Sequence, residues 1–595
     1  MNNKGVAIRY GDVAPEAKEN FIPSASESEF NTLSQLQQYN LNFPNYANPC
    51  EKYSVVLDGT ATAFPSVPEQ ANLGLWSEQI SNDDGTFTEP IVLELESVGQ
   101  YSSQGLTLTF DTYNGIYATR VGIKWLRITD EGITTLDEKE YNPDNAFYFC
   151  RNFVENYNKV VITFYSLNMP KNRLKLRVID YGYGTFFYGD ELRGVKLIQE
   201  IDPISTQISI NTADFTLDSK GDMEYSFQAK QPLSVYFNGQ LKATTFVKKS
   251  TRKAKRLWNI QSEDYIGLLD SIPYYGGIYT NKNAVELLTD IFTVAKVPYN
   301  IDDVFADAVV TGYIPFTTCR DALMQVAFAI QAVVDTSNSE VVKVFALEED
   351  VKQTVPLNRI MQGQNFADEE TVTGVEVTVH SYKPITETVD AYDARESGIG
   401  ENVFVKFSEP LYDLKIGILG NDGETFIETE NRADILEYGA NYAILNIKEL
   451  CLLRGKKHEH STQIYKKKNE VVLANEIKKV VAIENATLVS QHNIDNVIDK
   501  CYNWLIKTNT VNLDIVEGKH IQYGEPYKYG TGLKYGSGIK YGGKHPNIVT
   551  YDEPVNVGDK IDAETEYLGV LQGKRNIKQS FNLNGNILVK KAVLK

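Results

Sequence analysis

The chain has 595 residues, enough for several domains of ordinary size. Hydrophobic residues make up 42% of it and aromatic residues 11%, which allows large buried cores and excludes a globally disordered chain. The 78 acidic residues outnumber the 59 lysines and arginines, giving a formal charge of -19, and this excess of negative charge argues against a protein that wraps nucleic acid.

Residues 1–45 are polar and contain a serine-rich turn and a run of glutamines. This composition predicts an N-terminal arm that either becomes ordered against a partner or stays disordered. Residues 46–180 differ, because short runs that alternate apolar and polar residues, such as 91–95 and 106–110, are separated by turn signals. Strands at this spacing, with no helical periodicity between them, predict an antiparallel β-sandwich.

Residues 181–250 predict further strands, and Asn238-Gly239 is a strong signal for a two-residue hairpin turn. Helical periodicity begins only within 251–350, where a short helix opens over Asp264 to Leu269 and Asn283 caps a longer one. An apolar stripe over residues 319–333 predicts another helix, and a strand over 341–345 completes a small α/β domain.

Residues 351–595 return to strand patterns. We expect two helices among them, one over all or part of 433–453 and one over 495–505. The sequence therefore predicts a mainly β protein with α+β parts.

The sequence carries no nucleophile elbow, HExxH motif, phosphate-binding loop or dinucleotide fingerprint, so we expect no enzyme, no cofactor and no metal site. The five scattered cysteines form no CxxC pair, which is typical of reduced thiols in a protein that folds in a cytoplasm. The first residues do not resemble a signal peptide, and no run of about 18 apolar residues predicts a membrane-spanning helix.

A series of short phrases occurs in a fixed order between residues 208 and 585 of the chain. They are ISINTADFTL (208–217), QPLSVYFNG (231–239), WNIQSEDYIGLL (258–269), YGGIY (275–279), GYIP (312–315), CRDAL (319–323), VGDK (557–560) and FNLNG (581–585). In this order they resemble the baseplate hub and tail-associated proteins of phages and phage-derived particles.

The resemblance implies a homotrimer in which each subunit supplies two tube-type β-barrels, one from residues 181–250 and one from 351–595. Three such subunits would mimic a six-fold ring that joins a hexameric tail tube to a trimeric spike or tip. The expected partners are further copies of the chain, a tail tube or distal tail protein, a spike or tip protein and a tape measure protein. Such a protein is made in a bacterial cytoplasm and assembled into the tail tip of a virion or phage-like particle, including contractile injection systems.

The β-sandwich of residues 46–180 resembles carbohydrate-binding jelly rolls of the galactose-binding type, most clearly over YSSQGLTLTFD (101–111). Aromatic rings pack on sugar C–H faces and charged groups bind hydroxyls, so the candidate glycan-binding residues are Trp76, Tyr113, Tyr117 and Arg120. The alternatives are that Trp76 is a core residue and that the tyrosine loop has no function. For the whole chain, the alternative to a hub is a glycan-binding adhesin or receptor-binding protein.

Six cations fall within nine residues of this acidic chain: Lys248, Lys249, Arg252, Lys253, Lys255 and Arg256. They are candidates for a subunit contact, and the alternatives are a solvated segment and a patch that binds phosphate or nucleic acid. A repeat of Tyr-Gly at a spacing of six, within residues 523–542, places its tyrosines on one face of an extended chain. Those tyrosines are Tyr523, Tyr529, Tyr535 and Tyr541. We expect an extended ribbon or loop that docks on a partner or lines the mouth of the tube, and the alternatives are a flexible loop and a choline- or glycan-binding repeat.

His458 and His460 are two residues apart and would face the same side of a strand, which a metal site permits. His492 is the only third ligand that the sequence suggests. The neighbouring charges predict an exposed turn instead, and we expect no metal there.

Overall fold

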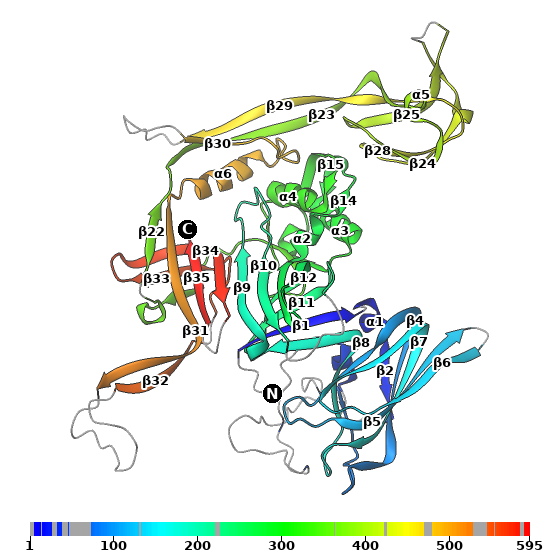
Figure 1. Ribbon diagram of the computed structural model, residues 1–595. Helices are drawn as coiled ribbons and strands as arrows, with labels where there is room; N and C mark the ends of the chain where they lie inside the picture. The colour runs from blue at the N-terminus through cyan, green and yellow to red at the C-terminus, as the bar shows by residue number, and fades with distance from the viewer. Residues whose placement is uncertain are drawn as a thin grey trace. The chain divides into compact units, whose positions relative to one another are not determined.

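The computed structural model (Figure 1) describes residues 5–13, 15–26, 32–37, 46, 51, 73–129, 132–219, 227–361, 363–421, 425–468, 479–526, 544–551, 554–583 and 588–595. The chain divides into two compact units. The first holds residues 1–193, 217–242 and 250–258, and the second holds 194–216, 243–249 and 259–595. Strands greatly outnumber helices, which confirms the mainly β fold with α+β parts. Within the described ranges, no helix has the length and apolar character needed to cross a bilayer.

The first unit is built on long antiparallel strands. Its elements are β1 (Val6–Val13), α1 (Pro15–Asn20), β2 (Ile22–Ala25), η1 (Leu33–Gln37), β3 (Leu75–Trp76), β4 (Thr86–Phe110), β5 (Ala118–Thr129), β6 (Gly132–Tyr141), β7 (Phe147–Leu167), β8 (Lys175–Tyr188), η3 (Gly189–Glu191) and β11 (Pro232–Phe237). Strand β4 pairs with β7 along most of its length, β7 pairs with β5, and β5 pairs with β6. The other edge of β4 pairs with β2 over its first half and with β8 over its second.

The core of this unit follows from the alternation that the sequence displays. Inward residues of β4, β5 and β7, among them Leu108, Trp125 and Phe164, are completely buried. Burial of large apolar side chains at every second position stabilises each strand against the core by roughly 1.5–3 kcal/mol per side chain.

The N-terminal segment differs from the predicted arm, because β1 pairs antiparallel with β8 and with β11. Ile8 and Tyr10 are buried, and Arg9 between them lies 2.7 Å from the carboxylate of Asp180 on β8. Lys18 on α1 donates to the other oxygen of Asp180 at 2.6 Å. Two cations of this segment, Arg9 and Lys18, are therefore internal, where the carboxylate of Asp180 pairs with both.

Several strands contribute residues to both units: β9 (Leu192–Glu200), β10 (Thr212–Asp218), β12 (Gln240–Arg252) and β13 (Leu257–Glu263).

An α/β part of the second unit follows them. It contains α2 (Tyr265–Leu269), β14 (Pro273–Tyr274), β15 (Gly277–Asn283), α3 (Ala284–Ala295), β16 (Tyr299–Ile301), η4 (Asp303–Phe305), β17 (Val309–Ile314), β18 (Thr317–Thr318), α4 (Cys319–Ile330), β19 (Val333–Asp335) and β20 (Val342–Phe345). Asn283 caps α3 by accepting a backbone N–H bond, as the sequence predicts, and Asp264, expected as the first residue of its helix, caps α2 in the same way. Helix α4 is capped by Thr318 and buries the predicted apolar stripe.

A small closed sheet forms the C-terminal part of the second unit. Its elements are β21 (Gln353–Val355), η5 (Leu357–Arg359), β22 (Asn365–Asp368), β31 (Asn509–Pro526), β32 (Lys544–Tyr551), β33 (Lys560–Thr565), β34 (Gly569–Asn582) and β35 (Leu588–Leu594). Strands β33, β34, β35 and β31 pair in that order. Strand β21 pairs with β33 at one edge, and the following segment meets β31 at the other through Ile360 and β22. The segment thus closes the sheet around a core that includes Val511, Ile515 and Ile561.

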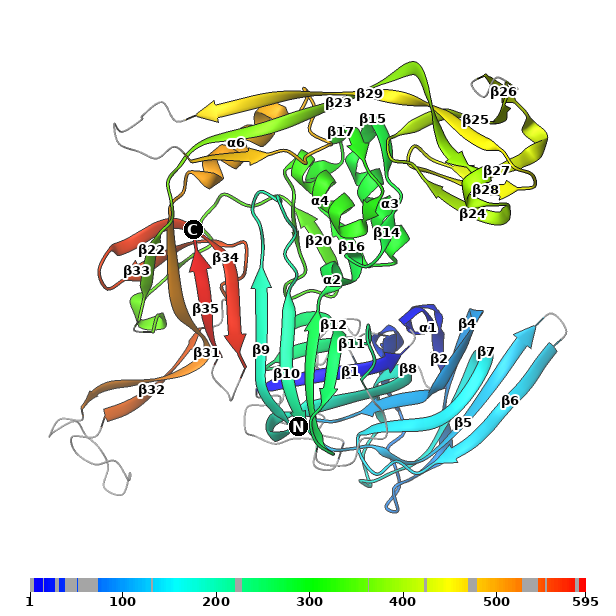
Figure 2. The ribbon, with the colours of Figure 1, turned by 45° about the horizontal axis from the view of Figure 1, so that its top comes forward.

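The remaining elements of the second unit form a long ribbon with a lobe at one end. They are β23 (Val372–Asp393), α5 (Ala394–Ser397), β24 (Gly400–Lys406), β25 (Leu411–Leu419), β26 (Phe426–Glu428), η6 (Glu430–Arg432), β27 (Ala433–Tyr438), β28 (Tyr442–Ile447), β29 (Leu452–Lys468), β30 (Lys479–Ile483) and α6 (Ile494–Leu505). Strands β23 and β29 pair antiparallel along the ribbon, and α6 packs against it (Figure 2). The predicted helix over 495–505 is confirmed as α6.

The predicted helix over residues 433–453 is wrong. This stretch forms β27, β28 and the beginning of β29, because Ala443, Leu445 and Ile447 are buried at every second position. That period is the one of a strand.

Candidate functional site

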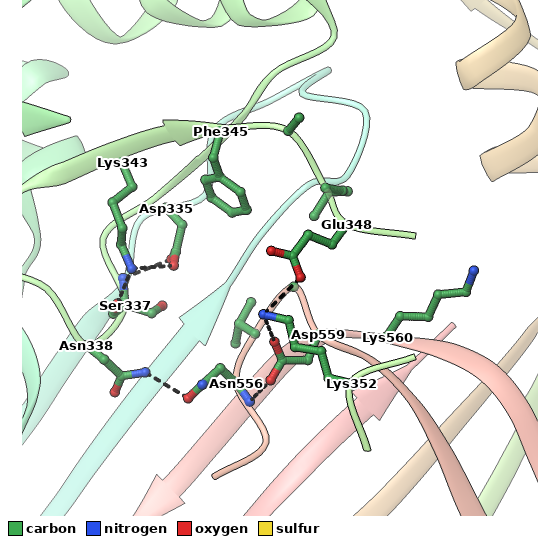
Figure 3. Close-up of a pocket in the computed structure, with 14 residues that line it drawn as sticks. Asp335, Ser337, Asn338, Lys343, Phe345, Glu348, Lys352, Asn556, Asp559 and Lys560 are labelled. Carbon is green, nitrogen blue, oxygen red and sulfur yellow. Dashed lines mark hydrogen bonds and ion pairs between the residues drawn. The ribbon is translucent and has the colours of Figure 1, made fainter. Parts of the chain in front are cut away.

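A pocket of about 290 Å³ lies between the end of β20 and the turn before β33 (Figure 3). Its lining includes Asp335, Ser337, Asn338, Lys343, Phe345, Glu348, Lys352, Asn556, Gly558, Asp559 and Lys560. One wall of the pocket contains the VGDK phrase, so residues 557–560 of that sequence motif line the pocket.

Charged groups in this pocket are paired with one another. The Lys352 ammonium lies 3.2 Å from the Asp559 carboxylate and 3.5 Å from that of Glu348. Burial opposes the charged form of Lys352, but the two carboxylates outweigh it and raise the pKa of that lysine. Asp559 also accepts the backbone N–H of Asn556 at 2.6 Å.

The opposite wall, formed by residues 335–343, is also fixed by polar contacts. Lys343 donates to the backbone carbonyl of Ser337 at 2.9 Å and lies 3.7 Å from Asp335. The Asn338 amide donates to the Asn556 side-chain oxygen at 3.1 Å across the pocket, as Figure 3 shows. These contacts make the described lining a polar joint between two chain segments.

Gly558 makes the turn of this joint possible. Its φ of +92° lies in a region that L side chains rarely adopt. A Cβ there would stand 3.5 Å from Ile201 and 3.8 Å from Leu347, in ordinary contact, so the backbone conformation rather than lack of space explains the glycine.

Trp76 is not available to a sugar, which corrects its place among the glycan candidates. The residue is 2% exposed and clusters with Tyr46 and Leu73. The Lys175 ammonium lies 4.6 Å from the centroid of its ring and the Arg177 guanidinium 5.5 Å. Its ring is therefore occupied by cation–π contacts inside the unit.

The other three glycan candidates are held by separate sets of contacts. Tyr113 is 41% exposed, in a turn where Asp111 accepts the backbone N–H groups of Tyr113 and Asn114. Tyr117 packs against the core of the unit. Arg120 pairs with Glu140 at 2.8 Å and lies over the ring of Tyr165.

The run of cations lies at the end of β12 and in the turn before β13. The exposed residues of this run are Lys248, Lys249, Arg252, Lys253, Lys255 and Arg256. Lys248 pairs with Glu263 at 2.6 Å, and Arg252 lies 5.1 Å from the ring centroid of Trp258. A turn of the chain thus displays positive charge at a surface.

The first Tyr-Gly of the repeat, at 523–524, belongs to a two-stranded extension. Strand β31 continues past the closed sheet, and its residues 518–526 pair with β32. The backbone of Tyr523 lies in this pairing, opposite Pro546. Tyr529, Tyr535 and Tyr541 lie outside the described residues. Of the four tyrosines in the predicted ribbon, the described residues therefore include the first, and its backbone is in an extended strand.

Sequence reasoning missed the partner of His460. The ring of His460 on β29 contacts that of His380 on β23, with 2.9 Å between Nε2 of His460 and Nδ1 of His380. His458 points to the backbone carbonyl of Pro410 instead, at 3.1 Å. The two partners are 80 residues apart in sequence, and only the register of β23 against β29 brings them together.

No protein-family model matches the chain, and no curated protein matches it. Solved structures of tail proteins resemble it at low identity. A tail protein from Neisseria meningitidis has a TM-score of 0.39 and 8% identity, covering 69% of this chain and 93% of its own. A 43 kDa prophage tail protein from Shewanella oneidensis has a TM-score of 0.37 and 8% identity, covering 69% and 95%. A prophage tail protein from Listeria monocytogenes has a TM-score of 0.35 and 9% identity, covering 70% and 91%.

Proposed function

We propose that the chain is a structural protein of a phage-type tail, a hub that forms a trimeric ring between a hexameric tail tube and a trimeric spike or tip. One observation carries the proposal. Residues 196–200 of β9, in the first region expected to supply a barrel, pair antiparallel with residues 578–582 of β34 in the second. Strands from both regions therefore run edge to edge in one ladder.

This ladder is fixed by polar contacts as well as by backbone bonds. The side-chain amide of Gln579 donates to that of Gln199 at 2.6 Å, and both residues are almost fully buried. Beside them, Lys578 pairs with Glu200 at 2.6 Å. A buried polar pair selects one register, because any shift would leave its groups unsatisfied.

A continuous wall of this kind is what a ring adapter requires. If each chain supplies two adjoining sheet regions, three chains supply six, and six matches the symmetry of a tube. Further contacts within the assembly fall to the β31–β32 extension and to the cations of the β12 turn. The latter suit an acidic face on a neighbouring subunit, since the chain as a whole carries a charge of -19.

The first test is the absolute mass of the full chain by light scattering over a range of concentrations. We expect a species of three times the chain mass of 66.9 kDa, which dissociates on dilution. A strict monomer at every concentration would overturn the ring proposal.

Two charge reversals test the contact surface. Lys249→Glu with Lys253→Glu should shift the trimerisation midpoint to higher concentration by at least about tenfold, since like charges across an interface repel. Lys171→Glu, an exposed lysine of the first unit that lies 3.3 Å from Asp83, is the matched control and should leave the midpoint within about twofold.

Recognition of a cell-surface glycan by the first unit remains a prediction. It rests on Tyr113, Tyr117 and Arg120, since Trp76 is buried.

A further inference from the structure

Two histidine rings, His380 of β23 and His460 of β29, meet on the long ribbon. Nδ1 of His380 lies 2.9 Å from Nε2 of His460, and the planes of the two rings differ by only 3°. The ring of Tyr382 stacks on that of His460, with 4.7 Å between centroids and 8° between planes. His460 is exposed and His380 half-buried, so ions in solvent can reach the pair.

The other nitrogen of His380 fixes which atom carries its proton. Nε2 of His380 lies 2.7 Å from the backbone carbonyl oxygen of Glu484, which can only accept. Nε2 of His380 therefore carries the proton, and the Nδ1 lone pair faces His460. A carbonyl that orients the remote N–H of an imidazole is the usual second partner of a metal-binding histidine.

We propose that His380 and His460 together bind one Cu²⁺ or Ni²⁺ ion. Two nitrogens 2.9 Å apart can both stand about 2.05 Å from one ion when the angle at the ion is about 90°. That angle belongs to the tetragonal geometry of Cu²⁺ and Ni²⁺. Imidazole nitrogens suit both ions, and Cu²⁺ binds such sites more tightly than Zn²⁺ does in the usual affinity order of divalent first-row metals.

Binding requires one proton to move and one ring to turn. In the ion-free pair, Nε2 of His460 donates to Nδ1 of His380. For an ion to enter, that proton moves to Nδ1 of His460, and the exposed ring turns so that both lone pairs converge on the ion. His380 keeps its bond to Glu484 throughout.

The site supplies two protein ligands and leaves positions open. Among the described residues, no group of three or more His, Cys, Asp or Glu side chains could hold a metal. Water or an external ligand therefore completes the coordination. A bound ion would link β23 to β29 and stiffen the ribbon that carries the lobe, independently of the role proposed for the whole chain.

The test uses the full chain, freed of metal with a chelator and titrated with CuCl₂. Calorimetry gives affinity and stoichiometry, and electron paramagnetic resonance reports the nitrogens bound in the equatorial plane. We expect one site with two nitrogen ligands. His380→Gln and His460→Gln should each weaken it by at least about tenfold.

His458→Gln and His492→Gln are the matched controls, because they remove histidines outside the pair. Both should leave the affinity within about twofold of the unmodified chain. Circular dichroism of every variant checks that the ribbon has folded. Copper binding that survives in both His380→Gln and His460→Gln, or a spectrum without two nitrogen ligands, would overturn the proposal.

Discussion

Replacing Asp180 by asparagine removes the carboxylate that Arg9 and Lys18 share in the first unit. The two cations lie 2.7 Å and 2.6 Å from its oxygens, and all three side chains are almost fully buried. Burial alone would raise the pKa of Asp180, but the two cations lower it from 3.8 to about 2. Because Arg9 is on β1 and Lys18 on α1, the substitution should loosen the N-terminal segment first.

The magnitude follows from that pKa. A decrease of nearly two pKa units corresponds to about 2 kcal/mol of stability. Since the folded pKa is the lower one, this contribution is present above about pH 4 and is lost as the pH falls towards 2. The substitution should cost more, about 3–5 kcal/mol, because it leaves buried cations beside a neutral amide.

Hydrogen–deuterium exchange of peptides that cover Val6–Val13 measures the effect locally. Exchange in Asp180→Asn should be at least roughly 30-fold faster than in the unmodified chain, the equivalent of 2 kcal/mol. Glu138→Gln, which breaks an exposed pair with Lys124, is the control and should change little. Unchanged protection of β1 in Asp180→Asn would refute the reasoning.

Three further predictions concern other parts of the chain. Glu517 accepts hydrogen bonds from the buried ammonium of Lys590 and from a backbone N–H. Glu517→Gln should therefore destabilise the closed C-terminal sheet by about 2–4 kcal/mol, measured as faster hydrogen exchange in β35. Unchanged exchange would contradict this. Asp264→Ala removes the cap of α2 and should cost about 1–3 kcal/mol in denaturant unfolding, whereas a cost below about 0.5 kcal/mol would mean that the cap is dispensable. Trp76→Ala should lower the stability of the first unit by about 3–5 kcal/mol in thermal unfolding, because it removes a buried side chain. Tyr113→Ala should leave stability unchanged and abolish any glycan binding seen on an array. The reverse pattern would make Trp76 a ligand residue after all.

Local signals in the sequence were sufficient where the structure depends on neighbours along the chain. Asn283 is identifiable as a cap from the sequence because a capping side chain bonds a backbone group a few residues away, here three. The apolar residues of 433–453 fit a helix only if the turn at Gly439 is left out of account. The alternation of Ala443, Leu445 and Ile447 beyond it has the period of a strand.

Features that depend on strand register could not be predicted in this way. His380 and His460 meet because β23 and β29 pair in one register out of many. The sequence around Trp76 does not reveal its burial, because the residues that cover its ring, Lys175 and Arg177, come about a hundred positions later. The sequence does not reveal strand β1 for the same reason, because the carboxylate that pairs with Arg9 is on β8.

The ladder between β9 and β34 also has a consequence for synthesis of the protein. Glu200 and its partner Lys578 are separated by 378 residues. At about 5–20 residues per second, a ribosome needs roughly 20–75 s to deliver the second strand after the first. Throughout that interval β9 lacks the strand that pairs with its residues 196–200, and such an unpaired edge can recruit a strand from another nascent chain. Neighbouring ribosomes on one messenger would thus favour mispairing between copies, and slowing initiation so that ribosomes are spaced farther apart should raise the yield of correctly folded protein.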